Sequence, residues 1–148
     1  MTTWPYYLFA VAAGAMLPVQ FGINAQLAHW LGSPLRATLV SFAVGAAVLL
    51  AAVLVFARGI ADGRDLGAAP WWVWVGGCLG AFYVLGSVVT APKLGAAALF
   101  AFILAGQAVA SLVVDHFGWV GFEESPITPA RLFGLALVAA GVVLVRGL

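Results

Sequence analysis

Long apolar runs separated by short charged or turn-forming segments make up most of this chain of 148 residues. The runs cover about residues 6–27, 35–57, 71–90, 95–114 and 129–145. A helix rises about 1.5 Å per residue and needs about 20 residues to cross a hydrocarbon core about 30 Å thick. The first four runs reach that length, and the fifth, with about 17 residues, is at the short end of the range. The pattern therefore predicts five transmembrane helices.

The runs are typical of helices and not of barrel strands. Strands of a membrane barrel alternate apolar and polar residues, whereas a run such as VGAAVLLAAVLVFA is continuously apolar. Ser33-Pro34 and Thr128-Pro129 each place a capping hydroxyl before a proline at the first helical position. Pro92 confines the link between the third and fourth runs to a few residues. We predict an all-α membrane protein made of a single five-helix domain.

Composition excludes the soluble classes of protein. The chain is 65% hydrophobic and 7% charged, whereas soluble domains are about 25% charged. A soluble enzyme or a nucleic-acid-binding protein of this size could not cover its surface with so few charges, so the lipid bilayer is the expected surrounding. The sequence contains no nucleotide-binding loop, no HExxH or Cys/His metal cluster and no buried Ser/His/Asp set. We therefore expect no catalytic residue, no cofactor and no metal.

The basic residues are shared evenly between the two sides of the predicted membrane domain. Five spans place the termini on opposite sides, so that three cations fall on the side of the N-terminus (Arg58, Arg64, Arg131) and three on the other (Arg36, Lys93, Arg146). Cations near the span ends set orientation, and an even division gives no preference. We infer that the chain inserts both ways and pairs as an antiparallel dimer. Such a pair would reproduce a transporter built from two inverted halves, with each chain as one half.

Two polar stripes lie within the predicted spans. Gln20 and Asn24 are four residues apart and share a helix face, as do Gln107, Ser111 and Asp115. The two stripes occupy opposite halves of the bilayer in one copy. Inverting a second copy brings the first stripe of one chain to the depth of the second stripe of the other. We therefore assign Gln20, Asn24, Gln107 and Ser111 to a substrate pathway between the copies.

Ser41 belongs to the same set of candidate pathway residues, because it lies toward the side of Gln20 and Asn24. Pro18 removes one helix hydrogen bond beside this stripe, and we predict a local helix break there. The alternative interpretation is structural. Amides and hydroxyls in transmembrane helices often only join neighbouring helices, with about 0.6–2 kcal/mol for each hydrogen bond.

Two further pairs have candidate roles at helix surfaces. Gly76 and Gly80 form a GxxxG pair, which is typical of close helix packing or dimerisation. Asp115 and His116 lie at the end of the fourth predicted span, where they could relay protons or face water and lipid headgroups. No carboxylate or lysine lies near the centre of any span. The sequence therefore gives no sign of a buried proton-coupling acid.

The segment GAMLPVQFGINAQLAHWLGSPLRATLVSFAVG, followed by GGCLGAFYV and APKLGAAALFAFILAGQAVASLVVDHFGW, resembles the YdcZ-type family of small bacterial inner-membrane proteins. That family belongs to the drug/metabolite transporter superfamily, and the resemblance covers nearly the whole chain. It implies a five-helix, multi-pass exporter of the bacterial inner membrane. The family includes dual-topology homodimers, paired heterodimers and fused ten-helix proteins, so the partner is a second copy or a homologous chain.

The chain departs from the small multidrug resistance proteins in one respect that bears on function. It lacks their membrane glutamate in the first helix, which argues against proton-coupled export of organic cations. We expect a secondary transporter that exports a small polar or neutral metabolite by alternating access. The alternative is a non-transporting membrane subunit or assembly protein whose polar stripes bind partner helices.

Overall fold

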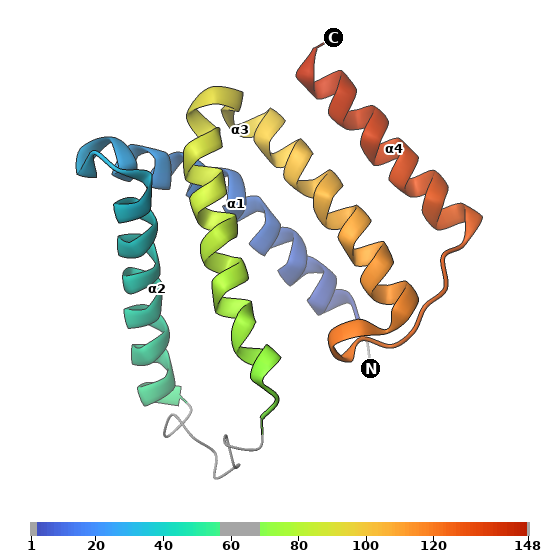
Figure 1. The fold of residues 1–148 in the computed structure, drawn as a ribbon, viewed down its shortest axis with the longest axis horizontal. Helices are drawn as coiled ribbons and strands as arrows, with labels where there is room; N and C mark the ends of the chain where they lie inside the picture. The colour runs from blue at the N-terminus through green and yellow to red at the C-terminus, as the bar shows by residue number, and fades with distance from the viewer. Residues whose placement is uncertain (1–2, 57–68, 148) are drawn as a thin grey trace. The chain divides into compact units, whose positions relative to one another are not determined.

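The computed structural model describes residues 3–56 and 69–147, and all regular elements in these ranges are helices (Figure 1). They are α1 (Trp4–Leu31), α2 (Pro34–Phe56), η2 (Trp71–Trp74), α3 (Val75–Phe117), η3 (Trp119–Gly121) and α4 (Pro129–Arg146). Four segments in this part of the chain are long and apolar enough to cross a membrane: α1, α2, α4 and the stretch Trp71–Phe117. The prediction of an all-α membrane protein is confirmed.

The ends of α2 and α4 follow the predicted capping signals. Pro34 is the first residue of α2, and the Ser33 hydroxyl accepts a hydrogen bond from the backbone N–H of Arg36 at 3.4 Å. Pro129 is the first residue of α4, and the Thr128 hydroxyl accepts from the N–H of Arg131 at 3.3 Å. Each cap satisfies one of the backbone donors that a helix leaves free at its N-terminus.

The third and fourth predicted spans form the 43-residue element α3, which contains one residue outside helical geometry. That residue is Gly95, with φ 75° and ψ 165°, whereas the sequence places the link between the spans around Pro92. A proline has a helix-compatible φ and can lie in a helix, but a positive φ with extended ψ is accessible essentially only to glycine. The interruption therefore falls at Gly95.

The chain divides into two compact units. The terminal unit comprises Met1–Pro18 and Leu94–Leu148, and the central unit comprises Val19–Lys93. Helix α1 contains Pro18 and continues through it from Trp4 to Leu31. Ala57, at the end of the second predicted span, and the loop cations Arg58 and Arg64 lie outside the described residues.

The core of the central unit lies where α1, α2 and α3 pack together. Ala37, Val84 and Val88 are buried there, and the partly buried side chains around them are Leu27, Ala28, Leu31 and Tyr83. Earlier in α3, Gly80 lies beside Phe42 of α2, and a Cβ atom at Gly80 would make an ordinary van der Waals contact of 3.5 Å with Cζ of that ring. Many large apolar side chains on the outside are exposed, as expected for surfaces that face lipid.

Candidate functional site

Asn24 places an unpaired amide inside the central unit. Its side chain is only 3% exposed, and Nδ2 has no hydrogen-bond partner among the described residues. Asn24 shares one face of α1 with Leu27, Ala28 and Leu31, which pack against the core. A buried donor without a partner costs about 1–3 kcal/mol. Such a group in an apolar core is a candidate contact for a water molecule, a ligand or a partner helix.

Tyr83 contributes a second unpaired polar group to the same unit. Its hydroxyl is buried and has no partner in the described part of the chain. Its ring lies 6.3 Å from the ring of Phe21, centroid to centroid, and Phe21 is 1% exposed. Because Phe21 precedes Asn24 by three residues, Phe21 and Asn24 share the α1 face that meets α3. The amide and the phenol therefore belong to one contact region between α1 and α3.

The other buried polar side chains of the central unit are satisfied. The Ser87 hydroxyl donates to the carbonyl oxygen of Val84 at 2.8 Å, and the Thr38 hydroxyl donates to that of Pro34 at 2.9 Å. Both bonds return to the residue's own helix, as serine and threonine hydroxyls commonly do in apolar surroundings. Asn24 and Tyr83 thus differ from their neighbours, and we call these two residues the amide–phenol pair.

Sequence reasoning identified Asn24 but not Tyr83. Aromatic residues at span ends are typical of membrane anchoring, and Tyr83 stands instead near the middle of a span. Its position alone could have identified Tyr83 as a candidate site residue, because a tyrosine hydroxyl at that depth has no water to bind. The other predicted members of this region are less enclosed: Gln20 is exposed and Ser41 is half-buried.

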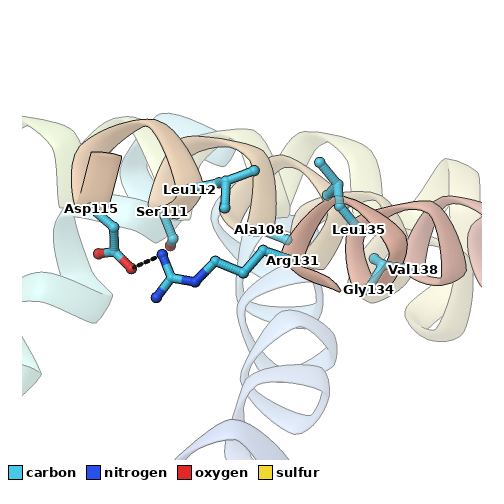
Figure 2. Close-up of a pocket in the computed structure, with 8 residues that line it drawn as sticks. All are labelled: Ala108, Ser111, Leu112, Asp115, Arg131, Gly134, Leu135 and Val138. Carbon is cyan, nitrogen blue, oxygen red and sulfur yellow. Dashed lines mark ion pairs between the residues drawn. The ribbon is translucent and has the colours of Figure 1, made fainter. Parts of the chain in front are cut away.

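The terminal unit holds an ion pair that the sequence did not reveal. The guanidinium Nη1 of Arg131 in α4 lies 3.5 Å from Oδ2 of Asp115 in α3, as Figure 2 shows. The same Nη1 donates to the carbonyl oxygen of Ser125 at 3.2 Å. These residues border a pocket of about 300 Å³ whose remaining lining is Ala108, Ser111, Leu112, Gly134, Leu135 and Val138.

Asp115 and His116 also hold the segment that connects α3 to α4. The backbone carbonyl of Asp115 accepts from the N–H of Ser125 at 2.7 Å, and Nδ1 of His116 accepts from the N–H of Ile127 at 3.4 Å. In this arrangement the contacts of both residues serve the connection between the helices.

Most of the remaining predicted positions lie on the outside of the single chain. Gln107 and Ser111 are exposed on α3, and Ser111 is the one that lines the pocket. Gly76 is exposed and a Cβ atom there would meet nothing within 4 Å, whereas Gly80 is half-buried against Phe42. The structure thus brings Asn24 into the core and leaves Gln20, Gln107 and Gly76 on exposed surfaces.

Comparison with known proteins assigns the family. Residues 5–144 match the family described as "Putative inner membrane exporter, YdcZ". The chain belongs to the YdcZ family. It is 33% identical over 110 residues to the inner membrane protein YdcZ of Escherichia coli strain K12, an alignment that covers 74% of this chain and 73% of that protein. No solved structure matches the chain.

Membership of the YdcZ family confirms the resemblance seen in the sequence. Together with the apolar helices, it establishes a multi-pass protein of the bacterial inner membrane, as predicted. It also supports a role in membrane transport and not in catalysis.

Proposed function

We propose that this chain is one half of a secondary transporter that exports a small polar or neutral metabolite, and that two copies work as an antiparallel dimer. The observation that carries the proposal is the amide–phenol pair. Asn24 Nδ2 and the Tyr83 hydroxyl are buried among apolar helices and have no partner among the described residues. In a membrane interior these groups must find a hydrogen bond, and a polar substrate supplies one.

The dimer proposal requires five spans, and the length of α3 supports them. A continuous helix of 43 residues would be about 64 Å long, about twice the thickness of the hydrocarbon core. Gly95 divides α3 into two segments, each with the length of about 20 residues that one crossing needs. Two crossings in α3 and one each in α1, α2 and α4 then place the termini on opposite sides.

The exposed polar face of α3 supports an inverted partner. Gln107 and Ser111 are exposed in the single chain although they lie within a segment of membrane-spanning length. An amide facing hydrocarbon is costly because lipid offers it no hydrogen bond. An inverted copy places this face at the depth of Gln20 and Asn24 of the first chain. The pathway then lies between the copies, with Ser41 as a secondary contact.

The chemistry of the pathway favours a substrate without a net charge. Asn24 offers two N–H donors and one carbonyl acceptor, and Tyr83 offers one O–H donor that also accepts. No ionisable side chain accompanies them at this depth in the sequence, so a charged substrate would remain unpaired. Because the pair is buried between α1 and α3 of one chain, we propose that rocking of the two copies parts these helices and exposes the pair to one side of the membrane and then to the other, as in transporters with inverted repeats.

A ligand screen followed by flux measurements tests this function. Purified protein is screened by thermal shift against amino acids, sugars, polyols and nucleosides, and compounds that stabilise it are tested for efflux from proteoliposomes. Asn24→Leu and Tyr83→Phe each remove one polar group with little change in shape, and we expect each to reduce the ligand-induced shift and the flux at least about tenfold. Thr38→Val is the control, because Thr38 already donates to its own helix. Undiminished flux in both variants would contradict the proposed pathway.

The second candidate function is a non-transporting subunit, which the exposure of Gln20 and Gln107 favours, because such amides can join partner helices. In that case the chain should co-purify with another membrane protein and should show no ligand-induced thermal shift. Replacing both glutamines with leucine would release the partner. In the transporter the same double variant separates the two copies.

A further inference from the structure

The pocket between α3 and α4 is charged at one end and mostly apolar along the rest of its length. One helix face of α3 contributes Ala108, Leu112 and Asp115, and one face of α4 contributes Arg131, Leu135 and Val138. Both charged residues are at the same end. From them the lining continues over seven residues on each helix, which is about 10 Å along the helix axes, and it is apolar except for Ser111. Figure 2 shows the acid and the base close together, with the apolar side chains farther along the two helices.

The charged end is open and incompletely satisfied. The side chains of Arg131 and Asp115 are 38% and 35% exposed, and their 3.5 Å separation exceeds the 2.7–2.9 Å of a strong charge-assisted hydrogen bond. Both side-chain contacts of Arg131 found in the described part of the chain use Nη1. The donors on Nε and Nη2 and the Oδ1 atom of Asp115 are therefore available to a ligand.

We propose that this groove binds a zwitterionic phospholipid of the phosphatidylethanolamine type. The phosphate would accept hydrogen bonds from Arg131, the primary ammonium would donate to Asp115, and an acyl chain would lie along Ala108, Leu112, Leu135 and Val138. An anionic headgroup would engage Arg131 through its phosphate but would bring no cation of its own to pair with the Asp115 carboxylate. A water-soluble zwitterion would leave the apolar walls without a partner. The groove opens beside Gly134, where a Cβ atom would meet nothing within 4 Å.

Native mass spectrometry of the purified protein tests the assignment. The probes are phosphatidylethanolamine, phosphatidylglycerol and the soluble headgroup glycerophosphoethanolamine. Gly134→Leu fills the groove and leaves the ion pair in place, and Gly141→Leu is the matched control on α4, because Gly141 also has open space around it but does not line the pocket. We expect phosphatidylethanolamine to bind at least about tenfold more tightly than either other probe, and Gly134→Leu to lose that preference while Gly141→Leu keeps it.

Arg131→Gln removes the phosphate contact and should weaken phosphatidylethanolamine binding about tenfold while leaving the groove open. Equal binding of phosphatidylglycerol would contradict the proposed pairing of the ammonium group with Asp115. Equal binding of the soluble headgroup would contradict the proposed contact between an acyl chain and the groove. An unaltered preference in Gly134→Leu would show that the lipid binds elsewhere. These outcomes do not depend on transport, because the site lies in the terminal unit and the amide–phenol pair lies in the central unit.

Discussion

At the scale of single residues, the position of a polar group decides its role more than its identity does. Gln20 and Asn24 share a helix face in the sequence pattern, yet only Asn24 is buried in the central unit. The spacing of four residues predicts the shared face correctly, but the extent to which α3 covers that face depends on tertiary packing. Tyr83 could not be grouped with Asn24 from the sequence, because only the packing of α1 against α3 places both in one contact region.

The unpaired amide of Asn24 makes a prediction about stability. In Asn24→Leu a side chain of similar size replaces a buried donor without a partner, so the free energy of unfolding should rise by about 1–3 kcal/mol. Thr38→Val breaks an existing hydrogen bond and should instead lower it by about 0.5–1.5 kcal/mol. Denaturation of the purified variants in detergent measures both changes. A loss of stability in Asn24→Leu would mean that the amide has a structural partner.

At the scale of helices, capping residues in the sequence predicted the N-terminal ends of α2 and α4, but the sequence did not locate the interruption in α3. The caps at Ser33 and Thr128 depend on contacts within one turn, so the sequence predicted them at the correct residues. The link between the third and fourth predicted spans was expected around Pro92, but the non-helical residue is Gly95. Proline and glycine both mark such places, and only the positive φ shows which of them interrupts the helix.

Gly95 therefore makes a prediction at this scale. Gly95→Ala forces a Cβ atom into a backbone conformation with φ 75° and should lower the free energy of unfolding by about 1–3 kcal/mol. Gly86→Ala is the control within α3, because Gly86 is helical and a Cβ atom there meets nothing within 4 Å. The control should be neutral or more stable by up to about 1 kcal/mol. Equal effects of the two substitutions in a denaturation experiment would show that the conformation of Gly95 is unimportant.

At the scale of the whole molecule, composition and apolar runs were enough to predict a multi-pass membrane protein, and membership of the YdcZ family places it in the bacterial inner membrane. The pairing of Asp115 with Arg131 was beyond the sequence, since it requires α3 and α4 to lie side by side. The inverted dimer remains a proposal. It is supported by the even division of cations in the sequence and by the exposed Gln107 and Ser111 on α3.

The sidedness of the two termini distinguishes insertion in both orientations from insertion in one. In a Cys78→Ala background, one chain carries Thr3→Cys and another carries a cysteine added after Leu148, and a membrane-impermeant maleimide is applied to intact and to permeabilised spheroplasts. Lysines added after Leu148 in the Thr3→Cys chain provide the control, because they break the balance of cations and should hold the C-terminus in the cytoplasm.

We expect labelling of intact spheroplasts to modify a comparable fraction of each terminal cysteine, because both orientations are present. The lysine control should then label almost completely from outside at Thr3→Cys. Labelling of one terminus only, and to completion, would mean a single orientation and would contradict the antiparallel dimer.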